Sequence, residues 1–138
     1  MLQEFRRLAL YVPVDEASQG PGLNVVSAAA VREILRTFRE FDFVGSVGTY
    51  KAVAEISVGA ETFVPTEDSA PVHGAANIAS TVPSARLVTY IPAGTPREEI
   101  DRMVGAVASV HPWEHPVIEV DRVSLWIPSA GGQAGSTS

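Results

Sequence analysis

The chain contains no cysteine and only one lysine, Lys51. The absence of cysteine excludes disulfide bonds, thiolate metal sites and a thiol nucleophile. Ten basic residues stand against sixteen acidic ones, which gives a formal net charge of −6, and the arginines are scattered along the sequence. Nucleic-acid surfaces need clustered positive charge facing phosphates, so the sequence predicts no nucleic-acid partner.

Long apolar runs are also absent. No window reaches the roughly 18 consecutive apolar residues of a membrane span, and the first residues lack the pattern of a secretory signal. We therefore expect a cytoplasmic protein with no membrane partner. The chain has 138 residues, 46% of them apolar, which is enough for one hydrophobic core. We expect one domain over residues 1–127 and a flexible tail over residues 128–138, which are mostly Gly, Ser, Ala and Gln.

What the chain does contain is an internal repeat. Residues 86–92 (RLVTYIP) repeat residues 7–13 (RLALYVP) with four identical positions, at a constant spacing of 79 residues from position 7 to position 86. Each segment precedes an amphipathic helix pattern with apolar residues at the i, i+3, i+4, i+7 spacing. The two apolar stripes are Val31, Ile34, Leu35 and Phe38, and Ile100, Met103, Val104 and Val107.

The repeat predicts two strand–helix–strand units. The first has a strand over Phe5–Val14, with Leu8, Leu10 and Val12 on one face, and a helix from the N-cap Ser27 to about Glu40. Two strands, 44–57 and 60–65, should follow, joined near Gly59, and residues 66–84 should form a loop with Pro83 among its breakers. The second unit starts at about Arg86, has a helix N-capped by Thr95 with Pro96 first, and ends with a strand over Val117–Trp126.

Two such units predict an α+β fold of the ferredoxin-like type, a double βαβ sandwich in which two helices cover one face of an antiparallel sheet. We expect apolar side chains on the other face, which no helix covers. Such a face is commonly hidden by self-association, so the sequence favours a homo-oligomer.

One segment carries a family resemblance. Residues 111–120 (HPWEHPVIEV) resemble the His-Pro-Tyr-Glu-Glu-Pro-Ala-Tyr-Asp-Val signature of NIF-three-like proteins. Residues 48–50 (GTY) and 62–65 (TFVP) are similar to that family's Gly-Asn-Tyr and Thr-Phe-Arg-Pro, with Pro71 and Gly74 in register behind them. The signature belongs to a domain that is inserted in longer members and also occurs alone.

This resemblance implies a PII/CutA-like fold and a trimer or other closed oligomer. It implies no metal ligands here, because the family's dinuclear metal site lies in two flanking domains that this chain lacks. The chain also departs from the family pattern: His115 replaces a Glu, Val64 replaces an Arg, and Val72-His73 replaces a Tyr-Ile pair.

Two segments have no counterpart in the repeat, the loop over residues 66–84 and the turn over residues 111–116, and we expect a specific activity there. As ligand-binding or interface residues we select Tyr50, Phe63, His111, Trp113, Glu114 and His115. A structural interpretation of the turn competes with this one: Pro112 ends the helix, Glu114 accepts backbone N–H bonds, and Trp113 packs on the sheet edge or a neighbouring subunit.

A metal site is the other alternative, with His111, His115 and His73 as ligands and Glu114 beside them. In an extended segment His111 and His115 would lie about 13 Å apart at ~3.3 Å per residue, so only a tight turn could join them on one ion. Such a site would hold a divalent ion and could be hydrolytic.

No catalytic set stands out, since the nucleophile motif G-x-S-x-G is absent and the histidines lie in loops. The sequence therefore favours a non-enzymatic, homo-oligomeric PII/CutA-like module without a cofactor. We expect it to bind a small molecule, an ion or a partner protein in clefts between subunits.

Overall fold

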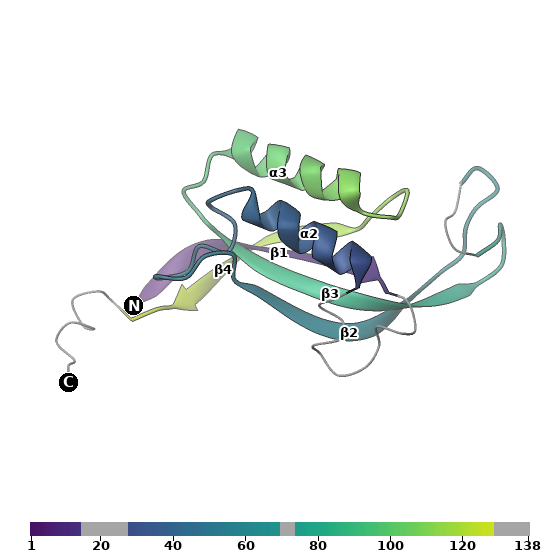
Figure 1. Cartoon of the computed structure of the whole chain (residues 1–138), viewed down its shortest axis with the longest axis horizontal. Coiled ribbons are helices and arrows are strands. Elements are labelled where there is room, and N and C mark those ends of the chain that lie inside the picture. Colours follow the sequence, from purple (N-terminus) through teal and green to yellow (C-terminus); the bar gives the residue numbers. More distant parts are fainter. Residues whose placement is uncertain (15–27, 70–73, 129–138) are drawn as a thin grey trace.

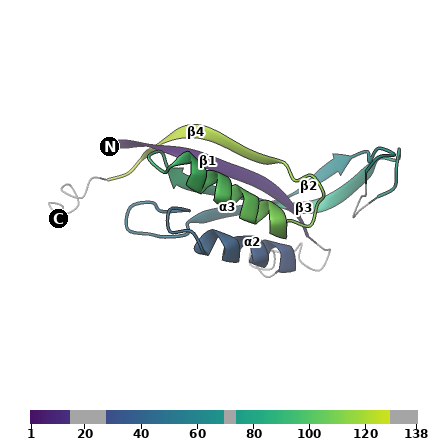
Figure 2. The same ribbon diagram turned by 90° about the horizontal axis from the view of Figure 1, so that it is seen from above.

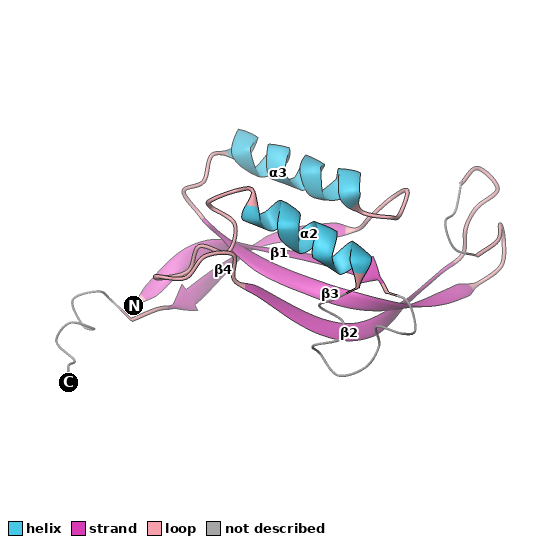
Figure 3. Cartoon of the chain, viewed as in Figure 1, coloured by secondary structure: helices cyan, strands magenta, loops and turns pink. Residues whose placement is uncertain are grey.

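The computed structural model describes residues 1–14, 28–69 and 74–128, which form two helices and four strands (Figures 1 and 3). In chain order these elements are β1 (Leu2–Pro13), α2 (Ala29–Arg39), β2 (Ala54–Phe63), β3 (Ser80–Pro92), α3 (Arg97–Val110) and β4 (Ile118–Trp126). The expected N-cap Ser27, the candidate ligand His73 and nearly all of the expected tail lie outside the described residues.

The strands form one four-stranded antiparallel sheet in the order β2-β3-β1-β4. Both helices lie side by side on the same face of this sheet (Figures 1 and 2). This arrangement confirms the predicted ferredoxin-like α+β fold. Neither helix is long and apolar enough to cross a membrane.

The core lies between the helices and the sheet, where the predicted apolar positions meet. Leu8, Leu10 and Val12 of β1 are at most 1% exposed and join one cluster with the stripes of both helices. Full burial of such a side chain stabilises the fold by about 1.5–3 kcal/mol. The 3.6-residue and 2-residue periodicities therefore place the core correctly.

The repeat becomes an approximate two-fold symmetry within the sheet. β1 pairs with β3 so that Ala9 lies opposite Val88, and these two positions are themselves equivalent in the repeat. As a result Arg7 lies opposite Tyr90 and, symmetrically, Tyr11 lies opposite Arg86.

The open face of the sheet, opposite the helices, differs from the expected apolar surface. Residues that alternate with the core positions point to this face, and many of them are charged. They include Arg7, Arg86, Glu55, Glu119 and Asp121 around the small apolar pair Ala9 and Val88. The expectation of an apolar open face is therefore wrong for most of this face, because only a small apolar centre is present and charged side chains surround it.

The segment between α2 and β2 also differs from the expectation. Residues 44–53 form turns rather than a strand, and β2 is a single strand that runs through Gly59 without a break. Gly45 makes the turn possible: it has φ +68°, donates its N–H to the carbonyl of Tyr90 at 2.7 Å, and accepts the N–H of Val53 at 3.0 Å. A left-handed residue in so close a contact favours glycine.

β3 begins at Ser80, six residues before the expected start, and includes Pro83. The carbonyl of Pro83 accepts the N–H of Val14 at 3.0 Å, so its backbone polar groups face the side of β1. The last pair of the β1–β3 ladder is Pro13 opposite Ser84, so Pro83 lies just beyond the end of this ladder. No strand residue needs an N–H from position 83, and proline is tolerated there.

The helix starts are shifted from the predicted caps. α2 begins at Ala29 after Ala28, and α3 begins at Arg97 with Pro96 in the N-cap position; neither cap has a side-chain hydrogen bond. Thr95 lies one residue before the N-cap, where its N–H closes a turn onto the carbonyl of Pro92 at 3.0 Å, and the carbonyl of Pro96 accepts the first helical bonds.

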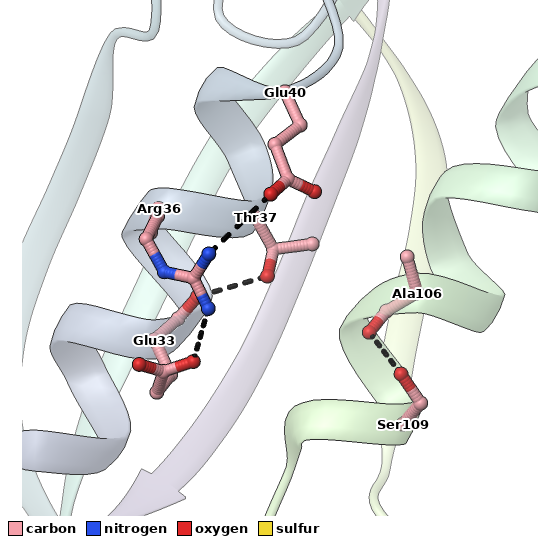
Figure 4. Close-up of polar contacts among 6 residues, drawn as sticks. All are labelled: Glu33, Arg36, Thr37, Glu40, Ala106 and Ser109. Carbon is pink, nitrogen blue, oxygen red and sulfur yellow. Dashed lines mark hydrogen bonds and ion pairs between the residues drawn. The ribbon is translucent and has the colours of Figure 1, made fainter.

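Several polar side chains of the two helices bond to partners within their own helix (Figure 4). Arg36 lies 2.6 Å from Glu33 and 3.5 Å from Glu40, and the Thr37 hydroxyl donates to the backbone carbonyl of Glu33 at 2.9 Å. On α3, Ser109 donates to the carbonyl of Ala106 at 2.8 Å. Arg36 and Ser109 are exposed, whereas Thr37 is buried and its hydroxyl is satisfied by the carbonyl of its own helix.

Candidate functional site

The turn after α3 is fastened to the sheet by His111, which is only 7% exposed. Its Nε2 lies 2.6 Å from the carbonyl oxygen of Tyr11, and its Nδ1 accepts the backbone N–H of Trp113 at 3.0 Å. Since the carbonyl can only accept and the N–H can only donate, the imidazole carries its proton on Nε2. The β1–β4 ladder ends at Leu10 opposite Ile118, which leaves the Tyr11 carbonyl available.

Burial lowers the pKa of His111 from its ordinary value of 6.5, although the bond to the Tyr11 carbonyl opposes this effect. The neutral ring is therefore favoured at pH 7. Both nitrogen atoms form hydrogen bonds with backbone groups, so His111 links the end of α3 to β1 and to the turn.

Trp113, whose backbone N–H bonds to His111, packs against the end of β2. Its ring lies 5.3 Å from that of Phe63 at an interplanar angle of 59°, and 6.0 Å from the His111 ring at 70°. Tilted aromatic contacts of this kind are favourable. The indole Nε1–H is buried and has no hydrogen-bond partner within the described residues.

A pocket of about 400 Å³ lies beside this aromatic pair, between the end of β2 and the α3–β4 turn. The side chains that give it chemical character are Glu61, Phe63, Trp113, Glu114 and His115. The volume falls in the range of small-molecule sites, which are mostly apolar with a few placed polar groups.

Glu61 is less exposed than Glu114 and His115, the other two ionisable side chains of this lining. Its Oε1 accepts the hydroxyl of Ser84 at 2.9 Å, and Ser84 itself is fully buried. Burial raises the pKa of Glu61 above 4.5, partly opposed by the bond from Ser84. A partly desolvated carboxylate gains from a hydrogen-bond donor or a positive charge on a bound molecule.

The structure brings together four of the six residues selected from the sequence. Phe63, Trp113, Glu114 and His115 line the pocket, and His111 supports its wall. Tyr50 lies apart from them, 73% exposed in a turn bridged to Val47.

Sequence reasoning missed Glu61. The available signal was its position on a strand two residues before Phe63, which places both side chains on the same face of β2.

The metal alternative finds no ligand set in the described segments. His115 is 85% exposed and its Nε2 lies 3.7 Å from a Glu114 carboxylate oxygen, whereas His111 would have to give up a backbone bond to coordinate an ion. Among residues 1–14, 28–69 and 74–128, no group of three or more His, Asp or Glu side chains is placed to hold a metal.

No protein-family model and no curated protein matches the sequence. Solved structures do match. A Bacillus cereus protein related to NIF3 aligns over 89% of this chain with 21% identity and a TM-score of 0.61. The divalent ion tolerance protein CutA1 from Ehrlichia chaffeensis aligns over 94% of this chain and 88% of its own, with 12% identity and a TM-score of 0.50.

This chain spans only 26% of the NIF3-related protein, about a quarter of its length. At these identities the likeness concerns the fold alone. The chain therefore has the ferredoxin-like fold seen in CutA1 and in part of the NIF3-related protein.

Proposed function

We propose that this chain is a non-enzymatic PII/CutA-like module that binds a small molecule in the pocket beside Phe63 and Trp113 and associates with copies of itself. The observation that carries the proposal is the pocket, because four residues selected from the sequence meet there. They come from two segments far apart in the sequence, the end of β2 and the α3–β4 turn.

The lining indicates what the pocket would accept. Phe63 and Trp113 offer an aromatic wall, and Glu61 offers a partly buried carboxylate. A molecule with an apolar or aromatic body and a donor or cationic group fits both features. Because both nitrogen atoms of His111 are engaged with the backbone, a binding role is better supported than a role for this imidazole as a base.

The open sheet face supports self-association, with a second copy of the chain as its occupant. Arg7 has a cross-strand partner in Asp121 at 2.8 Å, but its repeat equivalent Arg86 lies opposite Ser57. Within the described residues Arg86 has no ion pair, and neither has Glu119 on the same face. Two copies packed through this face could pair Arg86 of one with a carboxylate of the other, which is complementary charge.

A thermal-shift screen of small aromatic amines and their neutral analogues tests ligand binding. We expect a binding compound to raise the melting temperature of the wild type by several degrees, as stabilisation by a ligand at many times its Kd requires. The Glu61→Gln and Phe63→Ala variants should lose most of this shift.

Glu55→Gln is the matched control, because Glu55 lies on the same strand and the same face but outside the pocket, where it bonds the Tyr90 hydroxyl at 3.3 Å. It should keep the full shift. The proposed site would be contradicted if no compound raised the melting temperature of the wild type. It would also be contradicted if a compound raised the melting temperature of both pocket variants as much as that of the wild type.

A further inference from the structure

A second pocket lies at the other end of α3, and its lining is basic. It has a volume of about 480 Å³ and lies between the start of α3 and the helix-covered face of the sheet. Its charged side chains are Arg6 of β1, Arg122 of β4, and Arg97 and Asp101 of α3. Arginines that are far apart in the sequence thus meet in an otherwise acidic protein of net charge −6.

Arg6 and Arg122 are directly opposite each other in the β1–β4 ladder. They share the face of the adjacent pair Leu8 and Val120. Like charges at directly opposed positions destabilise a sheet. The neighbouring pair on the open face, Arg7 and Asp121, has opposite charges and forms an ion pair at 2.8 Å.

The rest of the lining does not neutralise the two arginines. Neither Arg6 nor Arg122 has an ion pair in the part of the chain that the structure describes. The one carboxylate in the lining, Asp101, lies 3.9 Å from Nε of a third guanidinium, Arg97. Three positive groups therefore face one negative group in a single concave site.

α3 adds partial positive charge from its backbone. Its fourteen residues begin at Arg97, and Thr95, just before the helix, also lines the pocket. N–H groups of a first helical turn that have no partner favour anions. In α3 the N–H of Glu99 already donates to the carbonyl of Pro96 at 3.0 Å, which leaves those of Arg97 and Glu98 for a bound anion. Glu98 and Glu99 of this turn offset part of that charge, but Glu99 is itself paired with Arg102 at 2.7 Å.

We propose that this second pocket binds the phosphate group of a small phosphorylated molecule. Guanidinium groups bind phosphate oxygens through two parallel hydrogen bonds, and a dianionic phosphate would offset the opposed charges of Arg6 and Arg122. The inference is independent of the proposed ligand pocket, because the two sites share no residue.

The test measures binding of inorganic phosphate and pyrophosphate by calorimetry, and thermal stability at constant ionic strength with chloride as the reference. We expect both anions to bind the wild type and to raise its melting temperature above that in chloride. Arg6→Gln and Arg122→Gln should each weaken binding at least tenfold. Arg32→Gln removes the same charge from the exposed face of α2 and should leave binding unchanged.

Equal binding by the wild type and both pocket variants, or a stabilisation matched by chloride, would overturn the proposal. A wild type that does not bind phosphate would also overturn it. If the two arginine variants then change the mass measured by light scattering, the negative charge opposite Arg6 and Arg122 comes from another copy of the chain. If Arg6→Gln does not fold, Arg122→Gln carries the test, because Arg122 is exposed on the edge strand β4.

Discussion

At the scale of single residues, His111 links three backbone segments, because its ring contacts Tyr11 and Trp113 from the end of α3. Protonation would place a second N–H on Nδ1, where it would face the N–H of Trp113. The neutral ring is thus part of the folded structure, and this links stability to pH.

We predict that the free energy of unfolding falls as the pH is lowered from 7.5 to 5.5. The pKa of His111 is lowered in the folded state, so below about pH 6.5 the unfolded chain binds more protons. The stabilisation is present above the unfolded pKa and is lost as the pH falls through the folded one. Urea unfolding at several pH values measures this slope.

His111→Gln should reduce the slope and lower stability at pH 7.5 by about 1–3 kcal/mol, since buried backbone groups lose their partners. His115→Gln is the control, because His115 is 85% exposed. A slope that His111→Gln leaves unchanged would refute this role.

Protonation of Glu61 affects the free energy of unfolding in the opposite direction to protonation of His111. Burial raises the pKa of Glu61 above 4.5, so its protonated form favours folding at low pH and this contribution is lost as the pH rises through the folded pKa. Glu61→Gln should therefore raise stability at pH 7, by less than about 1 kcal/mol because the group is only partly buried. Denaturant unfolding of the ligand-free protein at pH 7 and pH 4 checks this, and a larger gain at pH 4 would contradict it.

At the scale of elements, the turn before β2 depends on Gly45. A Cβ at this position would lie 2.3 Å from the backbone nitrogen of Val53, and the φ angle of +68° is itself unfavourable for other residues. We expect Gly45→Ala to destabilise the protein by about 2 kcal/mol or more. Chemical denaturation of purified variants measures the loss.

Gly105→Ala provides the matched control. Gly105 lies inside α3, where an added Cβ would meet no atom within 4 Å. The same substitution should stabilise the protein there by about 0.5–1 kcal/mol, because alanine favours a helix interior. Similar effects at the two positions would show that the turn does not require glycine.

The elements also differ in how well the sequence predicts them. Both helices follow from apolar periodicity to within a few residues, because packing against the sheet demands that periodicity. The strand predicted over residues 44–57 starts too early, because the positive φ of Gly45 that makes the turn cannot be derived from the pattern of apolar residues. The sequence predicts Pro83 as a breaker, because its tolerance in β3 depends on where β1 ends, which only the strand register shows.

The candidate site is also predictable only in part from the sequence. Phe63, Trp113, Glu114 and His115 lie in the segments that carry the family resemblance, residues 62–65 and 111–120, and they line one pocket. The opposed arginines Arg6 and Arg122 are separated by most of the chain, so only the strand register reveals that they meet.

At the scale of the whole molecule, self-association can be tested at Arg86 on the open face, which has no ion pair among the described residues. We expect Arg86→Glu to reduce the mass measured by light scattering, because it replaces an attraction across the proposed interface with repulsion. Arg39→Glu, on the exposed side of α2, should not change the mass. A wild type that is monomeric at all concentrations would contradict the assembly.

The strand order also has a consequence for synthesis. β1 lies between β3 and β4, so the first strand of this sheet to be made pairs only with strands that follow much later, as Phe5 does with Pro92 and Val123. At ribosomal rates β1 would wait on the order of ten seconds for β3. During that interval Leu8, Leu10 and Val12 have no ladder to join, and their apolar side chains stay uncovered until the second unit of the repeat is made.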